Sequence, residues 1–248
     1  MKTIYLIPIL LLALICSSCE YDNYDAPSLL LKGQLKYKED TFQFDGNVER
    51  GLLKIFQSGF GKVDVGTLIR VNQDGSFQQL LFGGEYWLTP NNSQYPFEFK
   101  DFKSLGVGLG YDSIHIQLSG DLEKNLEVIP YYTLENFSTL VNGDHVVLKF
   151  SVVKTGETAK QAPKVIKARA YLGTSAIVNS RTACIAETQV EIDNIGSVEI
   201  SVPIASYRNA YVNNFRDYAF CRVAIELENI PNYYLFSQVV KQEDIPNK

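Results

Sequence analysis

Residues 71–77 (VNQDGSF) decide the fold class, because they place a tight turn between two short apolar stretches. Asp74 is followed by Gly75, and this pair is a strong hairpin signal since glycine tolerates the positive φ that such turns demand. Residues 81–88 (LFGGEYWL) follow as a second apolar and aromatic stretch that contains a Gly-Gly pair. This part of the chain therefore predicts antiparallel β-strands joined by tight turns.

The same pattern extends outward from this hairpin in both directions. Short stretches with alternating apolar residues are separated by Gly, Asn, Asp and Pro, and no amphipathic helix longer than about two turns is evident. The 15 Tyr and 14 Phe also favour strands. We therefore predict an all-β protein of two β-sandwich domains, at residues 28–130 and 131–248. The clearest strand patterns are at residues 29–37, 114–118, 126–130, 146–152, 198–202 and 221–227.

The N-terminus has the features of a secretory signal peptide at residues 1–18. Lys2 supplies a positive charge, residues 4–16 are apolar, and two serines lead to Cys19. The apolar run is shorter than the roughly 20 residues that a transmembrane helix needs. Cys19 resembles the acylated cysteine of a bacterial lipobox, although Cys16 stands where an aliphatic residue is usual. We predict a lipid anchor at Cys19, and soluble secretion is the alternative.

Residues 19–27 form a short acidic tether behind the predicted anchor, with Glu20, Asp22 and Asp25. Acidic residues in this place resemble the export tag of Bacteroidetes-type surface lipoproteins. The resemblance implies a protein in the outer membrane that faces the cell exterior. The alternative is a solvated tether without a targeting role, because a polar segment ahead of a folded domain is flexible.

The strand and turn pattern around residues 71–88, D-G-S-F followed by G-x-Y-x-L, resembles the prealbumin-like or carboxypeptidase-regulatory-like β-sandwich. Together with Cys19, the tether and residues 128–131 (VIPY), it resembles the Bacteroidetes lipoprotein family of domain of unknown function 3823. The resemblance implies an immunoglobulin- or fibronectin-like second sandwich. Such proteins are typically encoded beside outer-membrane glycan importers of the SusC/SusD type, which implies an accessory role in nutrient capture with these importers as partners.

Charge and motifs argue against several other classes of function. The net charge of −5 makes nucleic acid an unlikely partner, because phosphate binding needs a basic face. His115 and His145 fall in different predicted domains and have no metal-ligand spacing, so we expect no metal and no cofactor. The glycine run at residues 106–110 lacks the Lys-Ser/Thr of a phosphate loop. No nucleophile elbow occurs, and we predict a protein that is not an enzyme, although counting carboxylates leaves a glycosidase pair open.

Two cysteines remain after the predicted cleavage, Cys184 and Cys221. An even number of cysteines in one exported domain favours a disulfide. Two free cysteines packed as small apolar residues fit the sequence equally well, because Cys221 continues an apolar alternation. The sequence is therefore consistent with either a disulfide or two free thiols.

Candidate ligand-binding residues occur in two places, where aromatic rings that pack on sugar faces lie beside amides that bond hydroxyls. In the first, strand alternation turns Trp87 outward if Tyr86 and Leu88 are in the core. The alternative for Trp87 is that it caps the core or lies at the contact between domains. The candidates are Trp87, Asn91, Asn92 and Tyr95 in the first place, and Tyr233 and Tyr234 in the second.

Two functions are consistent with these features. The first is a surface module that binds a glycan beside an importer. The second is a structural spacer or protein-interaction subunit with no ligand of its own. An exposed aromatic group in a hollow would favour the first function, and a flat apolar patch without a pocket would favour the second.

Overall fold

The fold was analysed in a computed structural model of the chain. The structure describes residues 25–46, 51–57, 66–106, 109–158, 160–181, 184–193, 195–209 and 216–246. The predicted signal peptide, Cys19, Glu20 and Asp22 lie outside the described residues. The described elements are strands apart from one five-residue helix, α2 (Ile204–Arg208), so the prediction of an all-β fold is confirmed.

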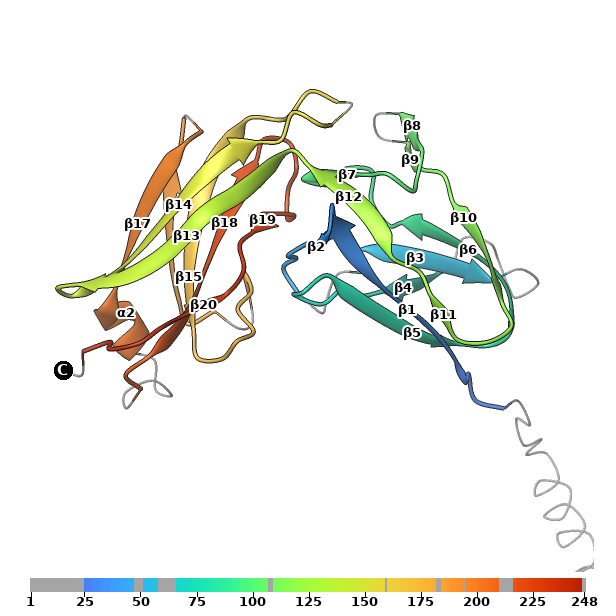
Figure 1. Ribbon diagram of the computed structural model, residues 1–248, viewed down its shortest axis with the longest axis horizontal. Coiled ribbons are helices and arrows are strands. Elements are labelled where there is room, and N and C mark those ends of the chain that lie inside the picture. Colours follow the sequence, from blue (N-terminus) through green and yellow to red (C-terminus); the bar gives the residue numbers. More distant parts are fainter. Residues whose placement is uncertain are drawn as a thin grey trace, which may run out of the picture.

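The N-terminal domain is a sandwich of two sheets (Figure 1). One sheet has the order β11-β1-β12-β7, with β2 and β5 also paired to β1, and the other has the order β10-β6-β3-β4. The short strands β8 and β9 form a separate hairpin. The bounds are β1 (Leu29–Tyr37), β2 (Asp40–Thr41), β3 (Leu53–Gln57), β4 (Thr67–Ile69), β5 (Ser76–Leu81), β6 (Gly84–Pro90), β7 (Phe97–Phe99), β8 (Ser104–Gly106), β9 (Gly110–Tyr111), β10 (Ile114–Leu118), β11 (Leu122–Glu123) and β12 (Leu126–Pro130).

The turn at residues 72–75 is built as the sequence predicts. Gly75 has φ of 79°, in the left-handed region that glycine tolerates, and a Cβ there would lie 2.4 Å from the carbonyl oxygen of Phe42. The Asp74 carboxylate accepts hydrogen bonds from the backbone N–H of Ser76 at 3.0 Å and from its hydroxyl at 2.7 Å. The turn thus starts β5 in the register that pairs it with β1.

The C-terminal domain is a second sandwich, with sheets in the orders β13-β14-β17 and β16-β15-β18-β19, and with β20 also paired to β18. Alternate side chains of the inner strands are buried, as in β17, where the three inward positions are apolar. The bounds are β13 (Tyr132–Asn142), β14 (His145–Lys154), β15 (Val165–Gly173), β16 (Ala186–Glu191), β17 (Ser197–Pro203), β18 (Ala219–Leu227), β19 (Leu235–Phe236) and β20 (Val240–Gln242).

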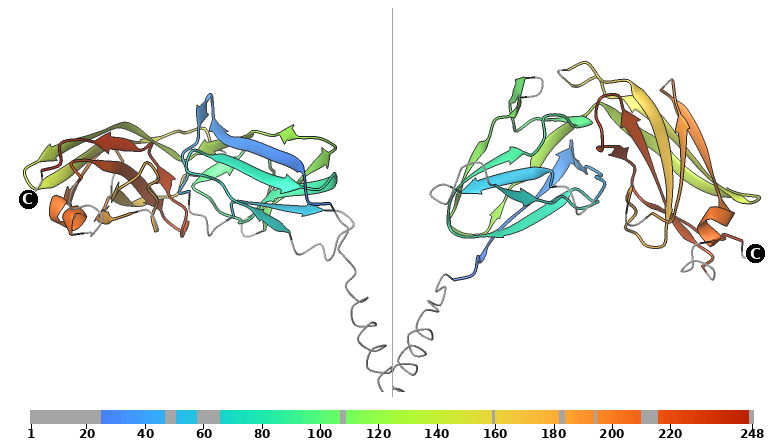
Figure 2. Two further views of the ribbon diagram at one scale, coloured as in Figure 1. Left: turned by 90° about the horizontal axis from the view of Figure 1, so that it is seen from below. Right: turned by 180° about the vertical axis from the view of Figure 1, so that it is seen from behind.

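The two sandwiches follow one another almost without a linker. β12 ends at Pro130 and β13 begins at Tyr132, so only Tyr131 lies between them. Figures 1 and 2 show the domains packed side by side, with the chain crossing once from β12 to β13. Buried apolar residues of both domains belong to one continuous core. The described residues therefore form one packed body. We call the contact between the two sandwiches the seam.

Hydrogen bonds across the seam hold this arrangement. Asp45 accepts bonds from the backbone N–H and the hydroxyl of Ser180 at 2.9 and 2.8 Å. The Gln73 side chain donates to the carbonyl of Ala176 and accepts from the N–H of Val178, each at 2.8 Å. A loop of the C-terminal domain is thereby fixed to two loops of the N-terminal domain.

Arg222 is a fully buried cation at the same seam. Its guanidinium donates to three backbone carbonyls, those of Ser237 at 2.9 Å, Val178 at 2.8 Å and Phe44 at 2.6 Å. It also lies 4.3 Å from the ring centroid of Phe236. Since Phe44 belongs to the N-terminal domain, this one side chain connects the two sandwiches through the interior.

Cys184 and Cys221 are both free thiols. They flank β15 on its two sides, because Cys184 leads into β16 and Cys221 lies in β18. Cys221 belongs to the main core, whereas Cys184 packs against a second cluster that contains Tyr171 and Val178. This placement separates the sulfur atoms, and the pairing that the sequence left open does not form.

Among the described residues, no helix is long and apolar enough to cross a membrane.

Candidate functional site

The two segments predicted separately as ligand-binding meet at the seam. They line a hollow of about 390 Å³ that we call the amide pocket. No charged side chain lines it, and four of its side chains are amides. Its lining residues are Gly51, Leu68, Asn91, Asn92, Ser93, Gln94, Pro231, Asn232 and Tyr233.

Hydrogen bonds fix the wall of the amide pocket that comes from the N-terminal domain. Asn91 donates from its side chain to the carbonyl of Gly51 at 3.1 Å and from its backbone to that of Leu52 at 2.9 Å. Asn92 donates from its side chain to the hydroxyl of Tyr233 across the seam. No donor among the described residues bonds to the side-chain oxygen of Asn91 or Asn92. Both exposed side chains can therefore accept hydrogen bonds from a ligand.

Tyr95 supports the amide pocket but does not line it. It lines an adjacent hollow of about 240 Å³, so its role as a ligand contact stays a prediction. The side chain is 2% exposed. Its hydroxyl donates to the carbonyl of Leu52 at 3.0 Å and accepts from the N–H of Asn92 at 2.7 Å. Its ring centroid lies 4.9 Å from that of Tyr233. Tyr95 thus holds the loop before it through these hydrogen bonds and its packing in the core. The same burial raises the pKa of its phenol.

Trp87 is outward-facing, as strand alternation predicts from the burial of Tyr86 and Leu88. It is 41% exposed and does not cap the core. In the sheet it lies between Phe56 of β3 and His115 of β10, and its ring centroid is 4.8 Å from that of His115. These three rings form a row across the outer face of the sheet. Trp87 is not among the residues that line the amide pocket.

Tyr234 belongs to a different cluster. Its ring lies 5.0 Å from the guanidinium of Arg169, which forms ion pairs of 2.7 Å with both Glu187 and Glu226. Burial raises the pKa of the Tyr234 phenol. The structure therefore separates Tyr234 from Tyr233, although the two are adjacent in sequence.

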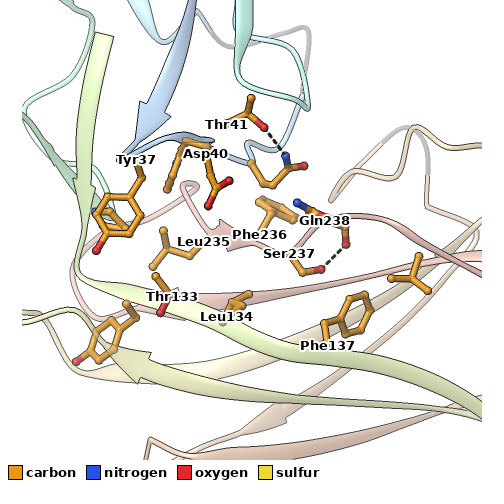
Figure 3. A pocket seen from close by; sticks show the side chains of 15 residues that line it. Tyr37, Asp40, Thr41, Thr133, Leu134, Phe137, Leu235, Phe236, Ser237 and Gln238 are labelled. Atoms are coloured by element: carbon orange, nitrogen blue, oxygen red, sulfur yellow. Dashed lines mark hydrogen bonds between the residues drawn. The ribbon is translucent and has the colours of Figure 1, made fainter.

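A second hollow of about 360 Å³ opens at the seam, and we call it the Asp40 cleft (Figure 3). Sequence reasoning missed it, because its walls come from the β1–β2 hairpin, β13 and the segment from β19 to β20. The only sequence signal was a cluster of polar turn residues at 38–41. It is lined by Tyr37, Asp40, Thr41, Phe42, Gln43, Pro130, Tyr132, Thr133, Leu134, Phe137, Leu235, Phe236, Ser237, Gln238 and Val240.

The histidines form no metal site in the described part of the chain, where no three His, Cys, Asp or Glu side chains gather to hold an ion. His115 packs against Trp87, and the Nδ1 atom of His145 lies 2.6 Å from a carboxylate oxygen of Asp144. A ligand at the two hollows of the seam would therefore meet hydrogen-bonding groups and apolar surface.

Comparison with family models gives a match for the N-terminal domain. Residues 29–129 match the family described as protein of unknown function (DUF3823), N-terminal domain. Comparison with curated proteins found no match.

Solved structures share the fold over both domains. A DUF3823 family protein from Parabacteroides merdae is 24% identical with a TM-score of 0.68, and the alignment covers 88% of this chain and 100% of that one. A DUF3823 family protein from Bacteroides uniformis is 16% identical with a TM-score of 0.67, covering 89% and 100%. Another Bacteroides uniformis structure, described as a "putative carbohydrate binding protein", is 14% identical with a TM-score of 0.62, covering 88% and 100%. Residues 29–129 therefore match the N-terminal domain of the DUF3823 family, and the chain shares its two-domain fold with solved DUF3823 family proteins.

Proposed function

We propose that this protein is a lipid-anchored surface protein that binds a glycan without catalysis, as an accessory to a SusC/SusD-type outer-membrane importer. The observation that carries the glycan-binding part is the amide pocket. Asn91 and Asn92 from one domain and Tyr233 from the other converge there, although about 140 residues separate them in sequence. The anchor and the importer rest on Cys19 and on the resemblance stated above.

The chemistry of the amide pocket suits an uncharged sugar. Sugar hydroxyls need both donors and acceptors, and an amide side chain supplies both. An aromatic side chain with a polar tip, such as Tyr233, offers an apolar surface to the C–H face of a pyranose ring. Leu68, which is 46% exposed at the rim, extends this apolar surface. A pocket lined by convergent polar groups and an aromatic ring is the usual form of a small-molecule site.

The relative from Bacteroides uniformis described in terms of carbohydrate binding supports the same proposal. Its identity of 14% is too low to transfer any residue, so the support is limited to the shared fold. A spacer or docking subunit without a ligand is the competing function. The seam pocket favours binding over this function, because a spacer needs no polar hollow.

The test is titration calorimetry of the mature chain against maltotetraose, cellotetraose, xylotetraose and mannotetraose. We expect one of these probes to bind, and Tyr233→Ala to weaken that binding by roughly ten- to a hundredfold, by analogy with the loss of one stacking ring. Asn92→Ala should weaken it by up to about tenfold, the scale of a single hydrogen bond. Asn142→Ala, an exposed asparagine at the end of β13, is the matched control and should have no effect.

Two results would overturn the proposal in different ways. Absence of binding by the unmodified protein to all of these probes and to a wider glycan array would favour the spacer function. Binding that both pocket variants leave unchanged would show that the glycan is held elsewhere, and the Trp87 ring row would then be the next place to mutate.

A further inference from the structure

We propose that the Asp40 cleft is a second, separate carbohydrate site, which takes an uncharged sugar unit and rejects acidic ones. This inference rests on the proposed glycan-binding function but concerns a different hollow. None of the residues that line the Asp40 cleft also lines the amide pocket.

Asp40 is the only charged residue among those that line the cleft. Its side chain is exposed, and no described residue forms a hydrogen bond or an ion pair with its carboxylate. In Figure 3 the carboxylate points into the space between Tyr37 and Phe236. A carboxylate can accept hydrogen bonds at both oxygens, so it is suited to two neighbouring hydroxyl groups.

The hairpin that carries Asp40 is held in place by a different carboxylate. Lys38 has φ of 57° and pairs with Glu157 of the C-terminal domain at 2.9 Å. The hydroxyl of Tyr37 donates to the same Glu157 oxygen at 3.1 Å. Lys38 is the nearest cation to Asp40 along the chain. Because it forms an ion pair with Glu157, it does not neutralise Asp40. The cleft therefore keeps a negative charge on a fixed backbone.

The rest of the cleft combines apolar surface with uncharged polar groups. Tyr37, Leu134 and Phe137 are half-buried, and each presents part of its side chain to the hollow. Figure 3 shows them spread along the cleft, with Gln238 on the opposite side from Tyr37. The amide of Gln43 donates to the Thr41 hydroxyl at 3.4 Å, so two uncharged polar side chains of the lining are hydrogen-bonded to each other. Such a surface can pack on a sugar ring while its edges bond hydroxyls.

Charge decides which sugars fit. A uronate or sulfated sugar would bring a second negative charge toward Asp40, and the cleft offers no cation to offset the repulsion. The chain as a whole carries a net charge of −5, which acts in the same direction. We therefore assign the cleft to neutral glycans.

The experiment is titration calorimetry with the neutral probe that binds best, together with tetragalacturonic acid. The unmodified protein should bind two neutral molecules per chain, and Tyr233→Ala, which keeps only the Asp40 cleft, should bind no tetragalacturonic acid. Asp40→Ala should reduce the number of neutral molecules from two to one, whereas Tyr233→Ala should remove the other site. Glu39→Gln, a change in the adjacent exposed carboxylate outside the cleft, is the matched control and should keep both sites.

Asp40→Asn tests the role of the charge, because the amide keeps one acceptor oxygen and the shape. This variant should bind the neutral probe at two sites within about tenfold of the original affinity, the scale of one hydrogen bond. Combined with Tyr233→Ala, it should bind tetragalacturonic acid at the cleft. One neutral molecule per chain, lost in Tyr233→Ala and unchanged in Asp40→Ala, would overturn the second site and leave the proposed function standing. Tetragalacturonic acid bound by Tyr233→Ala, which keeps only the Asp40 cleft, would overturn the charge selection.

Discussion

Arg222 on β18 donates a hydrogen bond of 2.6 Å to the backbone carbonyl of Phe44, and this bond joins the C-terminal sandwich to the N-terminal one through the protein interior. The same guanidinium satisfies two further carbonyls from the C-terminal domain. A buried charge is costly unless hydrogen bonds compensate for it, and here three carbonyl dipoles and the Phe236 ring do so. Arg222 is thus the buried member of a set of hydrogen bonds across the seam, which also includes those of Asp45 and Gln73.

Arg222→Met should therefore be strongly destabilising. The methionine fills part of the volume but leaves three buried carbonyls without donors, at about 1 to 3 kcal/mol for each unsatisfied group, less the relief of removing a buried charge. We expect the free energy of unfolding, measured with urea, to fall by about 3 kcal/mol or more. Arg70→Met, at an exposed position, is the control and should change it by less than about 0.5 kcal/mol. A loss below about 1 kcal/mol for Arg222→Met would show that the seam does not depend on this residue.

Trp87 and Tyr86 are neighbours on β6 but should respond in opposite ways to replacement by alanine. Tyr86 is 2% exposed, and removal of a large core ring costs about 3 to 5 kcal/mol. Trp87 loses mainly its packing on His115, which is worth about 0.5 to 1.5 kcal/mol. Thermal melting of the two variants side by side should give a large drop for Tyr86→Ala and a small one for Trp87→Ala. Equal drops in melting temperature would mean that the side chain of Trp87 is buried as deeply as that of Tyr86.

The Cys221 thiol should make stability depend on pH in the alkaline range. Burial raises its pKa from 9.0 to about 12, so between these values the folded chain keeps a proton that the unfolded chain releases. Stability from this group is complete below pH 9 and is lost as the pH rises toward 12, by about 1.4 kcal/mol per pH unit. Urea denaturation between pH 9 and 10.5 should show a shallower decline for Cys221→Ala than for the unmodified protein. An identical slope in both would contradict the assignment.

Cys19→Ala tests the proposed anchor. The variant should lose labelling by a radioactive fatty acid and move from the membrane pellet to the soluble fraction, because nothing then holds the chain to the bilayer. Replacement of Glu20, Asp22 and Asp25 by alanine is the companion variant. It should keep the lipid but lower protease accessibility on whole cells. A Cys19→Ala protein that stays in the pellet after a carbonate wash would refute lipidation as the means of attachment.

Local features of the fold were predictable from the sequence because they depend on neighbours in the chain. Asp74 and Gly75 specify their turn by side-chain bonding and by positive φ. Alternation along β6 correctly separates Trp87 from its two buried neighbours. Residue type alone selected Asn92 and Tyr233, but their contact across 141 positions depends on how the domains pack.

The features that the sequence did not reveal have a common physical cause. Tyr95 lies beyond the strand in which alternation applies, and its ring stacks 5.3 Å from that of Phe97 in the core. Asp40 gains its surroundings only when segments near residues 134 and 238 dock beside the hairpin. Arg222 did leave a signal, since it is a single cation inside the apolar stretch AFCRVAIEL, but that signal does not reveal the distant carbonyl of Phe44.

The connection from β12 to β13 is a single residue long, and this short connection affects how a ligand binds between the domains. When a ligand binds between domains that swing on a flexible linker, it must first restrict their motion, and this loss of conformational entropy weakens the measured affinity. Here the covalent path leaves Tyr131 alone to absorb any rotation, and its side chain is buried. The hollows at the seam are thus preorganised, and the proposed oligosaccharide ligand would lose little affinity to domain motion.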